Sequence, residues 1–116
     1  MELLNKEDAP SWFDYPAALR RIVGYNLTHL HPWLIMSREQ ALSRIEGMGK
    51  RYPSLEVVPF ARRLDRDDVA CFEKGSPESV AIIHDFSSAG WERRQVYPSF
   101  KAWFRAAVED MLDFEP

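Results

Sequence analysis

The clearest hydrophobic pattern lies near the C-terminus and predicts an amphipathic helix. Pro98-Ser99 opens this helix, with Ser99 as the N-cap residue. Apolar side chains then recur at helical spacing: Phe100, Trp103, Phe104, Ala107, Val108, Met111 and Leu112. This stripe needs a sheet or other helices to cover it.

Two further helices are predicted closer to the N-terminus. One runs from about Pro16 to Val23 and stops at Gly24, since proline is tolerated only near a helix start. The other begins after Ser37, where Gln40 completes a capping box, and Gly49 is a plausible end. Its core-facing residues are Ala41, Leu42, Ile45 and Met48, while Leu19, Ile22 and Val23 face the core from the earlier helix. From Tyr25 an irregular connector runs to Pro32, and a short apolar run, Trp33–Met36, precedes the second of these helices.

The hydrophobic period changes to that of strands after Leu55. The predicted strands are Leu55–Phe60, Asp68–Glu73, Ser79–Phe86 and Trp91–Tyr97. Pro59 indicates an edge or a bulge in the first of them, and Ser79–Phe86 is apolar on both faces, as in a central strand. We therefore expect an α+β fold, a mainly antiparallel sheet with helices packed on one of its faces.

Composition places the 116 residues in one domain with a feasible core. We expect residues 1–10 to fray. The net charge is −3 and the basic residues form only bare pairs (Arg20-Arg21, Arg62-Arg63 and Arg93-Arg94), which argues against direct binding of nucleic acid. A single cysteine, no signal peptide and no long apolar run predict a cytoplasmic protein that does not span a membrane.

Three carboxylates, Asp65, Asp67 and Asp68, lie within four residues between strand-like stretches. Aspartate is favoured in turns, so a turn explains them without a metal, and the Gly and flanking helices of a calcium loop are missing. An acidic loop that contacts a partner is the other reading left open.

Other reactive side chains form no catalytic pattern. His84 and Asp85 are adjacent on a strand and point to opposite faces, which favours a satisfied, half-buried histidine over a catalytic pair. His29 and His31 lie in the connector without a ligand-spaced carboxylate, and Cys71 suits a small buried hydrophobe. We therefore expect no catalytic residue, no metal and no cofactor.

Trp91-Glu92 follows the small-residue loop Ser87–Gly90 and is open to two interpretations. An aromatic ring beside a carboxylate is good contact chemistry for a basic protein partner. Alternatively, Trp91 belongs to the core and Glu92 pairs with Arg93 or Arg94.

Taken together, these stretches resemble the SUKH superfamily, which groups fungal cell-wall-assembly regulators with many bacterial immunity proteins. The matching segments are VVPFARRLDRDDVACFE, VAIIHDFSSAGWE and PSFKAWF, within residues 33–112. The pattern consists of Pro59-Phe60-Ala61, Asp67-Asp68, Cys71-Phe72, Gly90-Trp91-Glu92 and Ser99-Phe100 with Trp103. The N-terminal part departs from the family, because Tyr15-Pro16 and Tyr25-Asn26 stand where many members have Leu-Pro and Asn-Gly-Gly.

The resemblance implies a non-catalytic α+β domain that binds proteins, of the kind that neutralises a toxin, commonly a nuclease. The net charge permits a basic toxin domain as partner, and exposed aromatic residues would also permit a homo-oligomer. The predicted contact surface contains Asp65, Asp67, Asp68, Trp91 and Glu92, with Trp33 beneath or beside it. Two rival hypotheses are a small metal-dependent hydrolase, using His84 with Asp67, Asp68 or Glu92, and a regulatory scaffold domain.

Overall fold

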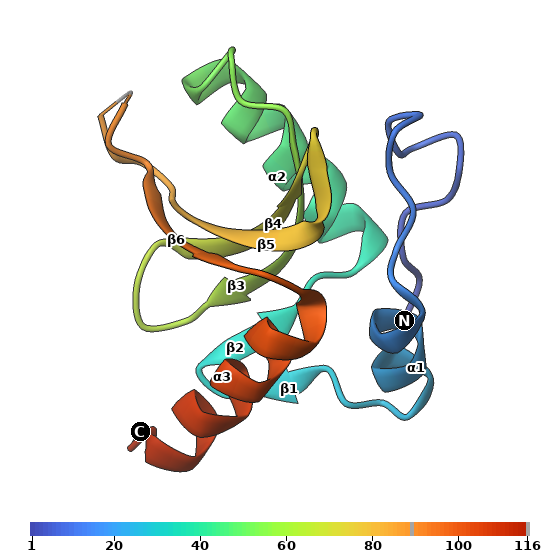
Figure 1. Cartoon of the computed structure of the whole chain (residues 1–116), viewed down its shortest axis with the longest axis vertical. Coiled ribbons are helices and arrows are strands. Elements are labelled where there is room, and N and C mark those ends of the chain that lie inside the picture. The colour runs from blue at the N-terminus through green and yellow to red at the C-terminus, as the bar shows by residue number, and fades with distance from the viewer. Residues whose placement is uncertain (89, 116) are drawn as a thin grey trace.

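The computed structural model describes residues 1–88 and 90–115, and only the backbone of Arg94. It is an α+β fold in which one antiparallel sheet has its six described strands in chain order. The strands are β1 (His29–Leu30), β2 (Trp33–Ile35), β3 (Val57–Arg63), β4 (Asp68–Glu73), β5 (Ser76–His84) and β6 (Arg93–Tyr97). The helices are α1 (Ala17–Gly24), α2 (Arg38–Arg51) and α3 (Phe100–Asp113), arranged around the sheet as Figure 1 shows.

An aromatic cluster joins α3 to one face of the sheet. The ring centroids of Phe60 and Phe72 lie 4.5 Å apart, and Trp103 meets Phe60 edge-on at 4.8 Å. Phe100 lies 5.7 Å from Phe60 and completes the cluster. Such offset and edge-to-face pairs add to the stabilisation that burial of their apolar area provides.

The opposite face of the sheet is also covered, so the expectation that helices pack on one face only is wrong. Neighbouring strand residues point to opposite faces, and Cys71, next to Phe72, is 0% exposed. Arg44 and Arg51 of α2 reach Asp85 on this second face. The interior strands are therefore buried on both sides, which explains the continuous apolar runs Val69–Phe72 in β4 and Val80–Ile83 in β5.

Local signals place the start of α2 correctly. The Ser37 hydroxyl accepts a hydrogen bond from the Gln40 backbone N–H at 3.4 Å, and the Gln40 side-chain oxygen accepts one from the Ser37 N–H at 2.9 Å. The predicted end at Gly49 is wrong, because α2 continues to Arg51. A single glycine costs a helix only about 1 kcal/mol relative to alanine, so it does not by itself stop one.

The N-cap of α3 gives a direct stability prediction. The Ser99 hydroxyl accepts a hydrogen bond from the Ala102 N–H at 3.1 Å. Replacing Ser99 with alanine leaves that N–H unsatisfied and should lower the free energy of unfolding by about 1 kcal/mol. Urea denaturation measures this loss, with Ser43→Ala on the exposed side of α2 as the control; equal stability of the two variants would show that the cap contributes nothing.

The predicted connector, which ends at Pro32, and the apolar run after it contain the short antiparallel pair β1–β2, which sequence reasoning missed. Leu30 lies opposite Trp33, and Trp33 lies opposite Arg63 of β3. Two- and three-residue strands are too short to show a period, and Pro32 between them argues against a strand. The pairing extends the sheet by two strands.

The remaining strands differ from the prediction mainly in their ends. β3 runs from Val57 to Arg63 rather than from Leu55 to Phe60, and the register shifts between Pro59 and Ala61. Pro59 therefore marks a bulge in an interior strand, not an edge. β5 begins earlier than predicted, at Ser76, after a turn in which Gly75 has a φ of 92°.

The N-terminal segment, where we expect residues 1–10 to fray, packs against the domain in the structure. Leu4 is only 4% exposed, and its N–H donates to the Tyr15 hydroxyl at 3.3 Å. The Asp8 carboxylate accepts hydrogen bonds from Arg38 at 2.6 and 3.0 Å. Composition suggested a polar tail, but Leu4 and Asp8 each have a partner far along the chain.

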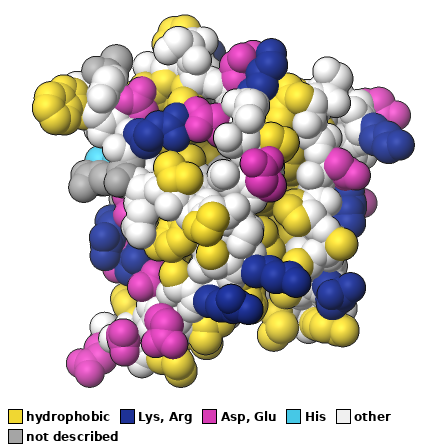
Figure 2. Space-filling model, viewed as in Figure 1, with side chains coloured by type: hydrophobic (Ala, Val, Ile, Leu, Met, Phe, Trp, Pro, Cys, Tyr) yellow, Lys and Arg dark blue, Asp and Glu magenta, His cyan; other side chains and the backbone are white. Residues whose placement is uncertain are grey.

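Charged side chains of both signs are interspersed over most of the face seen in Figure 2. Arg20 pairs with Asp14, and Arg63 pairs with Asp65 and Asp110. Arg93 pairs with Glu73. These arginine pairs therefore do not make a basic stripe in the part of the chain that the structure describes. No described helix has the length and apolarity needed to cross a membrane.

Candidate functional site at one end of the sheet

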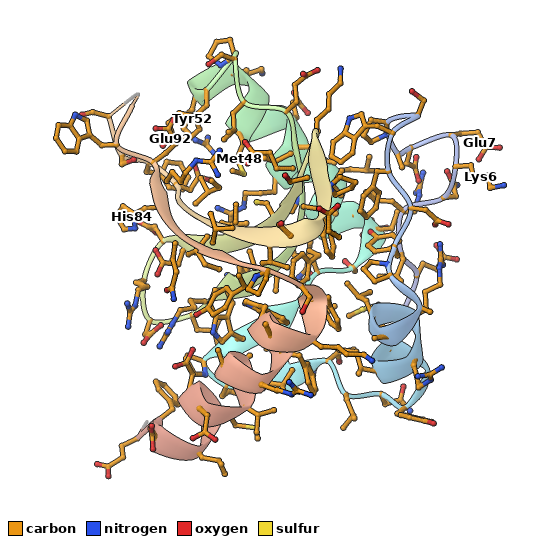
Figure 3. The ribbon with its side chains drawn as sticks, in the orientation of Figure 1. Lys6, Glu7, Met48, Tyr52, His84 and Glu92 are labelled. Carbon is orange, nitrogen blue, oxygen red and sulfur yellow. The ribbon has the colours of Figure 1, made fainter. Side chains whose placement is uncertain are left out.

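Two loops meet at one end of the sheet, because β3–β4 and β5–β6 turn there. Residues 64–67 connect β3 to β4, and residues 85–92, of which Ala89 lies outside the described part, connect β5 to β6. The Asp85 N–H donates to the Asp67 carbonyl oxygen at 2.9 Å and joins the loops directly. Figure 3 labels His84 and Glu92, which lie at this end, together with Tyr52 at the end of α2.

The acidic cluster lies in the bend between β3 and β4, and the chain itself neutralises much of its charge. Asp65 accepts hydrogen bonds from Arg63 at 2.8 and 3.1 Å, and this contact lowers the pKa of Asp65. Asp68 is 7% exposed and pairs with His84 at 3.0 Å. Asp67 is exposed and makes no side-chain ion pair among the described residues. Asp67 is therefore the carboxylate best placed to meet a partner.

Beside this turn is a polar hollow of about 330 Å³ whose lining carries both signs of charge. The acidic turn contributes one wall, and Phe86 contributes from the other loop. The basic residues in the lining are Arg44, Arg62, Arg63 and Arg66. With four guanidinium groups beside three carboxylates, the hollow does not present the acidic field that the sequence suggested.

Asp85 anchors the second loop, and sequence reasoning missed this role. Its carboxylate is 0% exposed and accepts hydrogen bonds from Arg51 at 2.7 and 2.7 Å and from Arg44 at 2.9 Å. Burial alone would raise the pKa of Asp85, but these hydrogen bonds hold it below the usual value. A buried ionised carboxylate is tolerated here because two cations and a backbone N–H satisfy it.

The sequence of α2 is arranged to make this contact. Arg44 and Arg51 are seven residues apart, two helical turns, so they lie on the same side of α2. A Cβ at Gly47 would lie 3.0 Å from both terminal nitrogens of Arg51. Glycine at this position leaves room for the guanidinium to reach Asp85, at a small cost in helix propensity.

Phe86 has a strained backbone that presents its ring to solvent. Its φ is +63°, a left-handed conformation that is rare for a bulky residue, and its side chain is 62% exposed. The Asp85 carboxylate accepts the Phe86 N–H at 2.9 Å, and the Arg51 guanidinium lies 4.1 Å from the ring centroid. Strain of this kind costs about 1–3 kcal/mol and is concentrated at functional sites.

The predicted contact residues are only partly brought together. Trp91 is 79% exposed at the end of its loop, so the alternative that it belongs to the core is wrong. Glu92 is half-buried, and Arg93 pairs with Glu73 rather than with Glu92; the side chain of Arg94, the other predicted partner, lies outside the described part of the chain. Trp33 is 3% exposed and donates a hydrogen bond to Asp110 at 3.0 Å, so it is a core residue.

His84 and Cys71 occupy the kinds of position that the sequence predicted. His84 is half-buried and satisfied by Asp68, and burial raises the pKa of the Cys71 thiol. Among the described residues, no group of three or more His, Cys, Asp or Glu side chains is placed to hold a metal ion.

No model of a protein family, no curated protein and no solved structure matches this chain.

Proposed function

We propose that this chain is a protein-binding domain without catalysis of its own, of the immunity type, which neutralises a toxin such as a nuclease by direct binding. The observation that carries the proposal is the exposure of three large apolar side chains on the two joined loops: Trp91 at 79%, Phe86 at 62% and Leu64 at 44%. The resemblance of the surrounding segments to the SUKH superfamily supports the same function.

The loop surface, defined as Leu64, Asp65, Asp67, Phe86, Trp91 and Glu92, has the composition of a protein contact. Aromatic side chains are enriched among the residues that dominate binding energy. Asp67 and Glu92 would supply polar contacts, which set the association rate and the choice of partner more than the affinity. The exposed apolar residues therefore support the proposal more strongly than the net charge does.

The rigid base of this surface also favours binding. Asp85 and Tyr52 hold the second loop: the Ser87 N–H donates to the Tyr52 hydroxyl at 3.0 Å, and that hydroxyl donates to the Ser87 carbonyl oxygen at 3.0 Å. A loop already fixed in one conformation loses less entropy when it binds.

Charge reversal at Asp67 and Glu92 tests the surface. The variant Asp67→Lys with Glu92→Lys should weaken partner binding about tenfold or more while the thermal midpoint barely moves, because Asp67 is exposed and no ion pair of the described residues depends on either side chain. Affinity capture from native lysate identifies the partner, and titration of the purified partner gives the affinity.

The matched control is Glu7→Lys with Glu78→Lys, two exposed residues outside the loop surface that change the net charge by the same amount. A partner retained by wild type and control but lost by the loop variant, and whose toxic activity is blocked on binding, supports the proposal. Equal capture of the partner by all three proteins would show that the contact lies outside the loop surface. A captured partner whose activity is unaffected favours a regulatory scaffold, and a large drop in thermal midpoint assigns the two carboxylates to the fold.

A further inference from the structure

The outer face of α3 carries a stripe of charges that is separated by sign along the helix. Lys101, Arg105, Glu109 and Asp113 are spaced four residues apart, so they follow one side of the helix, and all four are exposed. Figure 2 shows acidic side chains gathered over the C-terminal end of α3, at the lower left, with basic side chains over its N-terminal half.

This charge order is unfavourable for the helix by itself. A helix dipole favours anions near the N-terminus and cations near the C-terminus, but α3 has no acidic residue in its first turn and no basic residue in its last. Like charges four residues apart also repel, and this applies to Lys101 with Arg105 and to Glu109 with Asp113. Among the described residues, none of the four makes an ion pair within the chain.

Apolar side chains lie beside the charged stripe. Leu112 is 69% exposed, and Phe104 and Val108 are only half-buried. A shallow hollow on this face is lined by Phe104, Arg105, Ala106, Val108 and Glu109. An unpartnered apolar strip flanked by separated charges has the composition of an interface rather than of a solvated helix face.

We propose that this face of α3 binds the same face of a second copy of the chain, with the two helices antiparallel around a two-fold axis. In that arrangement Arg105 of each copy faces Glu109 of the other, and Lys101 faces Asp113, so every charge that is unfavourable within one helix gains an opposite charge. Parallel packing would place like charges together. A two-fold interface is made by the same patch on both copies, so the patch must complement itself. The charges of this stripe complement those of a second copy only when the two helices run in opposite directions.

The small size of the α3 interface limits the expected affinity of the dimer. The 14 residues of α3 extend over about 21 Å, which is short for a stable interface. The dimer should therefore be weak, dependent on protein concentration and weakened by salt. The proposal is independent of the loop surface, since no residue of that surface belongs to the stripe.

Charge-reversal variants used alone and mixed test the proposal by sedimentation velocity, over about 1 µM to 1 mM protein at low salt. Wild type should shift from the mass of one chain, 13.5 kDa, to that of two as its concentration rises. Arg105→Glu and Glu109→Arg should each stay monomeric, because like charges then face each other. An equimolar mixture of the two variants should form a mixed dimer. The first variant has glutamate at both positions 105 and 109, and the second has arginine at both, so opposite charges face each other again.

The mixture separates pairing between chains from any effect inside one helix, and circular dichroism confirms that each variant is folded. Arg21→Glu, an exposed charge reversal on α1, is the control and should dimerise like wild type. Wild type that stays monomeric throughout, single variants that dimerise as well as wild type, or a mixture that stays monomeric would each overturn the proposal.

Discussion

Replacing Asp85 with alanine is expected to lower the free energy of unfolding by roughly 3–5 kcal/mol, because the change leaves two partly buried guanidinium groups without their anion. Arg44 and Arg51 are only 23% and 30% exposed in their side chains, so water does not fully replace the lost partner. Chemical denaturation at neutral pH measures the loss. The exposed Asp14–Arg20 pair gives the control, since Asp14→Ala removes a carboxylate that water already solvates and should change stability little.

The pH dependence gives a second readout of the same contact. The folded-state pKa of Asp85 is lowered, so its contribution to stability is present above the unfolded carboxyl pKa of about 3.9 and disappears as the pH falls through the folded value. The difference in unfolding free energy between wild type and Asp85→Asn should therefore be constant from neutral pH down to about pH 5 and shrink below about pH 4. A difference that stays constant to lower pH would show that folding does not lower the pKa of Asp85.

Replacing Asp85 should also increase local opening of the loop surface. Asp85 accepts a hydrogen bond from the Phe86 N–H, and it also binds the Arg51 guanidinium that lies over the Phe86 ring. Hydrogen exchange at residues 86–88 should therefore increase in Asp85→Ala by more than global unfolding explains. This connects the stability of α2 packing with the shape of the proposed contact surface.

Sequence reasoning succeeded where structure depends on nearby residues. The capping box at Ser37 and the cap at Ser99 act over three residues, and both are present. Strand β4 also has the predicted bounds, Asp68–Glu73, since its apolar centre Val69–Phe72 is bordered by turn residues on both sides. These signals are local, and tertiary packing reinforces them.

Sequence reasoning failed where the position of a side chain depends on a partner far away in the sequence. Asp85 lies 41 and 34 residues from its two arginines, and nothing local separates it from an exposed aspartate. A partial signal did exist, since a carboxylate near the end of an apolar strand requires cations, and Arg44 lies in the predicted helix. Arg51 lies beyond the predicted end of that helix at Gly49, so the prediction did not place the two arginines on one side of it. Trp33 is buried rather than part of the contact surface for the same reason, because its place depends on Arg63 opposite it and on Asp110 of α3.

The same dependence explains why α3 is less buried than its pattern suggests. The helical period is correct, but Met111 and Leu112 are 37% and 69% exposed because they extend beyond the covered part of the stripe. Periodicity reports which side of a helix is apolar, not how far the neighbouring elements extend along it.

Replacing Trp103 with alanine is expected to destabilise the fold by roughly 3–5 kcal/mol, because Trp103 fills the space between α3 and the sheet. The residue is 1% exposed, and its ring lies 4.8 Å from Phe60 and 5.4 Å from Trp33. Removing it leaves a cavity that three other aromatic rings border. Trp91→Ala is the matched control: the same change at a residue that is 79% exposed should cost less than about 0.5 kcal/mol.

A milder substitution separates shape from hydrogen bonding at the same position. The Trp103 indole N–H is buried and has no hydrogen-bond partner among the described residues, and an unsatisfied buried donor costs about 1–3 kcal/mol. Trp103→Phe removes this donor while it keeps most of the ring, so its loss of stability should be well under half that of Trp103→Ala. If the two variants were equally unstable in urea denaturation, the full shape of the indole, rather than the apolar volume of a ring, would hold α3 in place.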